Sequence, residues 1–98
     1  MSQVSQERVV RDIAAERERQ DKQWGGPSHD DQHIEGMWLH VIGNFAHSAE
    51  SLMTARGVIP PSRRAAYRKE LVKIAATAVA AIEALDRKQA TLGSEVAS

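Results

Sequence analysis

Residues 68–87 of the chain read RKELVKIAATAVAAIEALDR, and this stretch decides the fold class. It is rich in alanine, glutamate, lysine and arginine, which lose little side-chain entropy in a helix. Apolar side chains recur in and just before it at intervals of three, four and seven residues, the spacing of one helix face. These side chains are Tyr67, Leu71, Ile74, Ala75, Ala78, Ile82 and Leu85. The pattern predicts a helix over about residues 63–88 and a frayed tail at 91–98.

Two further helices are predicted before it, over about residues 4–23 and 35–55. Opposite charges four residues apart support an exposed face on the first, and Gly25, Gly26 and Pro27 end it. The second has its own apolar stripe, formed by Trp38, Val41, Ile42, Phe45, Ala49, Leu52 and Met53. Strand-like alternation is absent from the sequence. We therefore predict an all-α single domain over residues 1–98, a three-helix antiparallel bundle in which the last two stripes face each other.

The segment AATAVAA at 75–81 places small side chains on several faces of the last helix. It indicates either the central helix of the bundle or a second interface with another copy of the chain. Ala76 and Ala80 lie off the main stripe, so we expect them to be exposed in a monomer. Three helices of this length bury a limited core, which favours a homo-oligomer.

Composition excludes several classes of function. Thirteen basic and thirteen acidic residues cancel, so no net field attracts nucleic acid or an anionic membrane. The chain has no cysteine, which rules out disulfides, thiol catalysis and thiolate metal sites. It has neither an apolar run of about 18 residues nor the apolar core of a signal peptide. We expect a cytoplasmic protein.

The core-facing line of the first predicted helix becomes polar halfway along. Val9, Val10 and Ile13 begin it, and at about 100° per residue it continues through Glu16, Arg17, Gln20 and Trp24. Inward polar groups must be paired or bound to a ligand, because burying them unsatisfied is costly. These four residues are candidate ligand-binding residues, unless this end of the helix overhangs the bundle and meets solvent.

The connector WGGPSHDDQH, residues 24–33, follows directly. His29 and His33 lie four residues apart with Asp30 and Asp31 between them, so one turn of chain offers imidazole and carboxylate ligands for a divalent ion. The same segment also fits a turn whose acidic residues complement the dipole of the next helix. Both interpretations remain open at the level of sequence.

Cations crowd the start of the last predicted helix, where the helix dipole disfavours them. They are Arg63, Arg64, Arg68 and Lys69. We expect an anionic group to compensate them, either the loop acids Asp30 and Asp31 or a bound phosphate. Arg64 and Arg68 are therefore further candidates for ligand binding.

The two motifs ERERQDKQWGGPSHDDQH and RKELVKIAATAVAAIEALDR together resemble a group of small, mostly uncharacterised bacteriophage proteins. A more distant likeness is to the MazG-like all-α nucleotide pyrophosphohydrolases, which bind magnesium through EExxE and ExxD motifs. This chain departs from that pattern: the first region reads HSAES with Glu50 as its one acid, and Lys73 stands three residues after Glu70. Glu83 and Asp86 fit the letters of ExxD, near the end of the helix.

Three hypotheses follow for the function. The first is a phage-type accessory protein that binds, without catalysis, a nucleotide-type ligand or a host defence protein. The second is a MazG-like nucleotide phosphohydrolase, in which Glu16, His29, Asp30 and Asp31 hold Mg, Mn or Zn and the arginines orient phosphates. The third is a purely structural helical oligomer.

Overall fold

The computed structural model describes residues 3–30, 32 and 34–97, and side chains for these except 28, 29 and 91–97. The elements are α1 (Gln3–Trp24), α2 (Gly26–Asp30), α3 (Glu35–Glu50), the 3-10 turn η1 (Pro61–Arg63) and α4 (Arg64–Ala97). The described residues contain no strand, which confirms the all-α prediction. Within the same part of the chain, no helix has both the length and the apolar character needed to span a bilayer.

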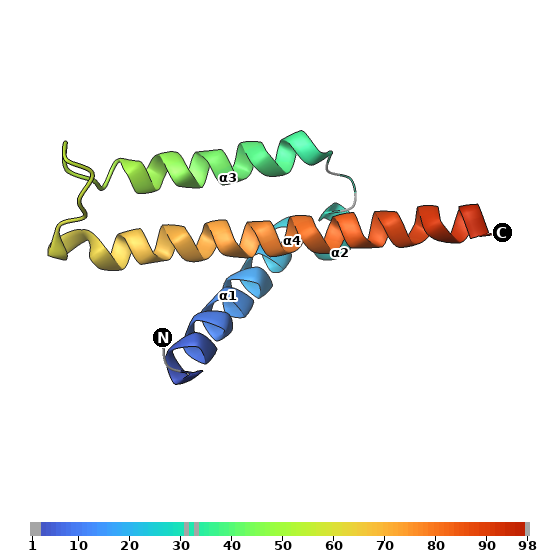
Figure 1. Ribbon diagram of the computed structural model, residues 1–98, viewed down its shortest axis with the longest axis horizontal. Coiled ribbons are helices and arrows are strands. Elements are labelled where there is room, and N and C mark those ends of the chain that lie inside the picture. Colours follow the sequence, from blue (N-terminus) through green and yellow to red (C-terminus); the bar gives the residue numbers. More distant parts are fainter. Residues whose placement is uncertain (1–2, 31, 33, 98) are drawn as a thin grey trace.

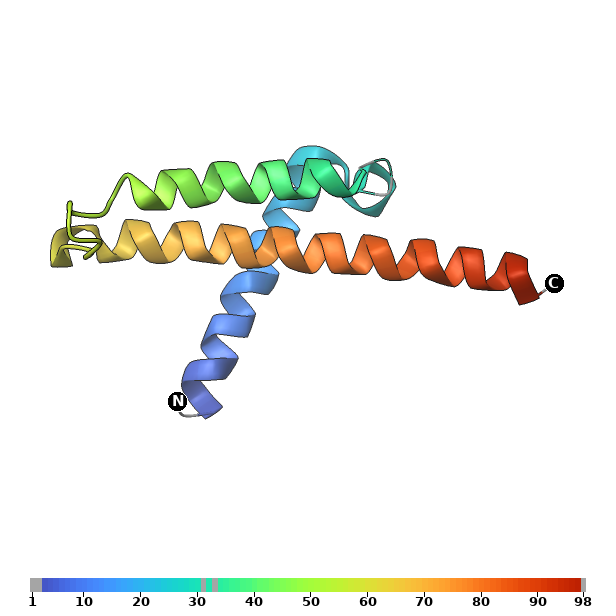
Figure 2. The same cartoon turned by 45° about the horizontal axis from the view of Figure 1, so that its top comes forward.

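Helices α3 and α4 lie side by side and run antiparallel in both views (Figures 1 and 2). Lys88 Nζ lies 3.3 Å from Glu35 at one end, and Arg63 donates a 3.2 Å hydrogen bond to the Leu52 carbonyl at the other. Between them, the Lys73 ammonium lies 5.6 Å from the centre of the Phe45 ring. The apolar stripe predicted for residues 35–55 forms the less exposed side of α3, on which Ala49 is buried.

Helix α1 crosses α4 obliquely and then diverges from it, as both views show (Figures 1 and 2). Among the described residues, α1 and α3 share no pair of Cα atoms within 8 Å. The predicted antiparallel three-helix bundle is therefore not seen in the single chain: an α3–α4 hairpin is crossed by a third helix on α4 alone. The radius of gyration is 16.2 Å, against about 12.6 Å for a compact domain of this length.

The buried face of α4 differs from the face that the sequence predicts. Ala76, Thr77 and Ala80 are 0, 1 and 2 % exposed, whereas Ile82 and Leu85 on the predicted stripe are 57 and 42 % exposed. Small side chains allow α1 and α3 to approach the same side of α4 closely, which larger residues would prevent. The expectations that this stripe faces α3 and that Ala76 and Ala80 are exposed in one chain are both wrong.

Several helix boundaries also differ from the predictions. The connector after α1 contains the short helix α2, reached through Gly25 and Gly26, whose positive φ angles of 104° and 68° reverse the chain. Helix α3 ends at Glu50 rather than near 55, and the chain then turns through Gly57, with φ 79°. Helix α4 continues to Ala97, through the segment predicted as a frayed tail.

Candidate functional site

The polar residues of α1 meet α4 where the two helices cross. Gln20 is 3 % exposed, and its Nε2 donates to Glu16 Oε2 at 3.1 Å and to Thr77 Oγ1 at 3.5 Å. The Thr77 hydroxyl in turn donates to the Lys73 carbonyl at 2.8 Å. The inward amide thus links α1 to α4, which satisfies the requirement that a buried polar group find partners.

The Glu16 carboxylate is held in its charged form by its own helix. Arg19 donates two hydrogen bonds to it, at 2.9 Å and 2.7 Å. These bonds, with further contributions from Gln20 and the positive charge of Lys73, lower the pKa of Glu16 against the opposing effect of burial. A carboxylate that accepts two hydrogen bonds from one guanidinium and one from an amide has little remaining capacity for another ligand.

Arg17 joins three segments of the chain. Its guanidinium lies 3.1 Å from Asp21 on α1, 3.2 Å from Glu83 on α4 and 3.7 Å from Asp30 at the end of α2. Asp30 is only 6 % exposed, so the Gly-Gly-Pro turn does return one loop acid to the polar part of α1. This contact positions α2 against α1 and α4.

Glu70 and Lys73 form a second polar pair on α4. Lys73 Nζ donates to Glu70 Oε1 at 3.2 Å, and both side chains are mostly buried. Glu70 Oε2 is also buried but has no hydrogen-bond partner among the described residues. The lysine that interrupts the MazG-like pattern therefore neutralises the preceding carboxylate.

The other candidate ligand-binding residues do not join this cluster. Trp24 is 38 % exposed at the end of α1. Arg68 lies 2.7 Å from Asp12, about 22 Å along α4 from Glu83 at 1.5 Å per residue, and the exposed Arg64 begins the helix. The expectation that Asp30 compensates these cations is wrong, because Asp30 faces Arg17.

The predicted metal ligands are only partly visible. Asp31, His33 and the side chain of His29 lie outside the described residues. Within the described part of the chain, no three histidine, aspartate or glutamate side chains gather closely enough to hold an ion. The side chains of Asp30 and of Glu16, the ligand added in the phosphohydrolase hypothesis, are described, and they lie in ion pairs with Arg17 and Arg19.

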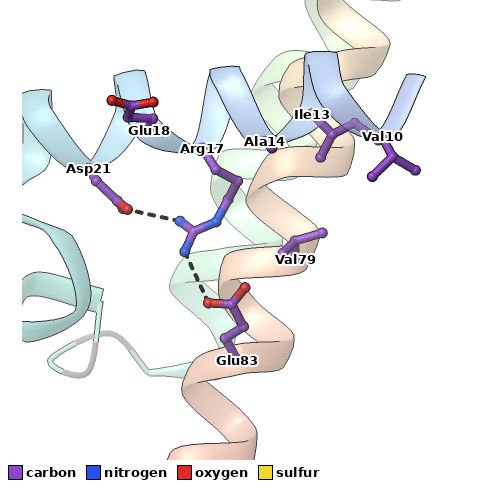
Figure 3. Close-up of a pocket in the computed structure, with 8 residues that line it drawn as sticks. All are labelled: Val10, Ile13, Ala14, Arg17, Glu18, Asp21, Val79 and Glu83. Atoms are coloured by element: carbon purple, nitrogen blue, oxygen red, sulfur yellow. Dashed lines mark hydrogen bonds and ion pairs between the residues drawn. The ribbon is translucent and has the colours of Figure 1, made fainter. Parts of the chain in front are cut away.

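A groove of about 410 Å³ lies in the angle between α1 and α4 (Figure 3). Val10, Ile13, Ala14 and Val79 supply its apolar lining. Its charged residues are Arg17, Glu18, Asp21 and Glu83, one cation against three carboxylates. The polar line of α1 pointed to Arg17, but the contributions of Val79 and Glu83 depend on the crossing of two distant helices and had no signal in the sequence.

Comparisons with known proteins do not assign the chain to a family. No protein-family model, curated protein or solved structure matches it. The resemblance to bacteriophage proteins stays a prediction from the two sequence motifs, and the more distant likeness to the MazG-like enzymes stays a prediction from the last helix.

Proposed function

We propose that this chain is a non-catalytic accessory protein of the bacteriophage type, which acts in the host cytoplasm by binding a host protein. The observation that carries the proposal is the groove between α1 and α4, with its apolar lining and acidic margin. The polar residues around it pair mainly with each other, as Arg17 does with Asp21 and Glu83. A surface of this kind supports binding more than it supports bond-breaking chemistry.

The charge of the groove distinguishes between the two ligand classes. A nucleotide would bring phosphates next to Glu18, Asp21 and Glu83, and the guanidinium of Arg17 is already engaged by two of these carboxylates. An amphipathic helix with lysine or arginine beside its apolar stripe would place cations at that margin and aliphatic side chains on the lining. The groove therefore favours a basic protein segment over a nucleotide.

Synthetic peptides test this preference directly. One peptide has leucine at helical spacing and lysine at the flanking positions, and its matched control has glutamate in place of lysine. We expect isothermal titration calorimetry to show tighter binding of the lysine peptide. Val10 lines the groove and is 59 % exposed, and Val10→Glu should abolish binding of this peptide. Val4→Glu, at 76 % exposure on the same helix outside the groove, should bind as wild type does.

Equal binding of the two peptides, or an equal loss in both variants, would contradict the proposal. A nucleoside triphosphate that binds the wild type in competition with the lysine peptide, and does not bind Val10→Glu, would show that the groove takes a nucleotide-type ligand instead of a host protein. Both results are obtained with the same titrations.

The second candidate function is a metal-dependent, MazG-like nucleotide phosphohydrolase. The buried Glu70 Oε2 favours it, because a carboxylate oxygen without a hydrogen-bond donor has capacity for an ion. Mg, Mn or Zn would then be held by Glu70 or by the predicted set around Asp30. Thermal shift with these ions, with and without a chelator, tests binding. Metal-dependent pyrophosphate release that is lost in Glu70→Gln would establish the enzyme instead of the binding protein.

We also propose that the chain works as a homo-oligomer. A compact monomer of 10.8 kDa exposes about 5,500 Å² of surface, and this chain exposes 7112 Å². Exposed apolar side chains contribute to that surface on every long helix, and those on α4 include Leu71, Ile82 and Leu85. Association that covers such side chains is favoured by the hydrophobic effect. A purely structural oligomer would associate in this way and bind none of the probes above.

A further inference from the structure

The side of α4 that faces away from α1 and α3 carries a regular apolar seam. Leu71, Ala75, Ala78, Ile82 and Leu85, here called the α4 seam, follow one another at intervals of four, three, four and three residues. This is the spacing of the contact positions in a coiled coil. At 100° per residue, the seam lies roughly 180° from Ala76 and Ala80, the residues buried against the other helices.

The geometry points to a second copy of this chain as the occupant of the seam, with the two α4 helices packed antiparallel about a two-fold axis at Ala78. Leu71 lies seven residues before Ala78 and Leu85 seven after it. Each Leu71 therefore packs against the partner subunit's Leu85, and the small Ala78 side chains meet at the centre. A self-complementary patch of this kind is what a two-fold interface requires.

The excess exposed surface of the whole chain is larger than the area that a stable dimer takes from each partner. The chain exposes roughly 1,500 Å² more surface than a compact monomer of its mass. A stable interface takes about 800 Å² from each partner. The seam also spans two full heptads, a length over which paired helices exclude water from leucine and isoleucine side chains.

Charge decides the direction of pairing. Arg63, Arg64, Arg68 and Lys69 lie at the start of α4, whereas residues 83–88 in its second half carry two acids, Glu83 and Asp86, beside Arg87 and Lys88. A parallel pair would place four cations beside four cations. An antiparallel pair separates the two basic ends, sets each beside a segment of mixed charge in the partner, and opposes the two helix dipoles. Arg68, ten residues before Ala78, then comes within side-chain reach of the partner subunit's Asp86, eight residues after it.

The shape of the chain agrees with this arrangement. The C-terminal end of α4 projects past α3 in both views (Figures 1 and 2). In the antiparallel dimer, this projecting end lies along the start of the partner's α4. Arg68, which pairs with Asp12 within its own chain, thereby lies near a second carboxylate at the subunit contact.

The first test is the mass in solution, by sedimentation or light scattering across micromolar concentrations. Wild type should have twice the chain mass of 10.8 kDa, and Ile82→Glu should reduce it to one chain mass. The matched control is Leu39→Glu on α3, which is 70 % exposed against 57 % for Ile82 and should stay dimeric. Far-UV circular dichroism checks that both variants stay helical. A monomeric wild type, or an Ile82→Glu variant with an unchanged mass, would overturn the proposal.

The second test uses the absence of cysteine from the chain. Leu71→Cys mixed with Leu85→Cys should give a disulfide-linked dimer under mild oxidation, because these positions face each other in the antiparallel pair. Each variant alone should link poorly, since its two thiols lie about 21 Å apart along the helices. Linkage in each variant alone would show a parallel pair, and no linkage in the mixture would show that the seams do not meet. The groove between α1 and α4 contains no residue of the α4 seam. The cross-linking result and the peptide titration therefore test the dimer and the proposed binding function separately.

Discussion

Replacing Ala76 by leucine tests the packing of α4 most directly. Ala76 is 0 % exposed, so the three added carbon atoms have no unoccupied space to enter. Overpacking of this kind costs about 1–3 kcal/mol, and leucine has nearly the helix propensity of alanine, so local helix formation does not obscure the effect. A domain of this size loses about 4–8 °C of melting temperature per kcal/mol, which predicts a decrease of roughly 4–24 °C.

The assay is thermal unfolding by circular dichroism at one fixed protein concentration, because the midpoint of a dimer would depend on concentration. Ala66→Leu is the matched control, since Ala66 is exposed near the start of the same helix and should melt within a degree or two of wild type. If Ala76→Leu melted as the control does, α1 and α3 would not close on this face of α4. The predicted apolar stripe would then be the true contact with α3.

Three further predictions concern the polar contacts at the crossing. The pKa of Glu16 is lowered mainly by its hydrogen bonds from Arg19. The stability that this carboxylate contributes to the fold is therefore fully present above its ordinary pKa of 4.5 and is lost as the pH falls below that value. In Glu16→Gln, the melting temperature should decrease less between neutral and acidic pH than it does in wild type. Asp30→Asn should lower the free energy of unfolding by about 1–2 kcal/mol, because it weakens a buried ion pair with Arg17. Amide hydrogen exchange in α2 should become faster. An unchanged exchange rate would mean that this contact does not hold the short helix. Gln20→Leu should lower the free energy of unfolding, measured by chemical denaturation, by less than about 1 kcal/mol. The reason is that Glu16 and Thr77, the partners of the amide, keep other hydrogen bonds. A decrease of several kcal/mol would show that the amide is essential to the crossing of α1 and α4.

Much of the local structure was predictable from short-range pattern. The apolar stripe of residues 38–53 and the end of the first helix at Gly25 and Gly26 depend on residues within a few turns of each other. So does the polar continuation of the core line on α1, which indicated the buried Gln20. The helical continuation beyond Lys88 was missed because the tail lacks a clear periodic pattern.

The candidate site was predictable only in part, for the same reason. Arg17 was found from its place on one helix, but its partners Asp30 and Glu83 come from two other segments. The sequence analysis paired Arg68 with the loop acids because their charges are opposite. Opposite charge alone does not show that two residues lie close together. The contact between Arg68 and Asp12 follows from the angle at which α1 crosses α4.

The sequence by itself determined that this protein is helical, that Gly25 and Gly26 end its first helix and which faces of its helices are apolar, because each property is set by backbone preferences and by side chains a few residues apart. Only the tertiary structure decided which face of α4 is buried against α1 and α3. Periodicity marks the seam of larger side chains as the better apolar face, yet helices approach most closely where side chains are smallest. Ala76, Thr77 and Ala80 therefore form the buried side. The choice between the two faces depends on what the neighbouring helices offer, and no local pattern contains that information.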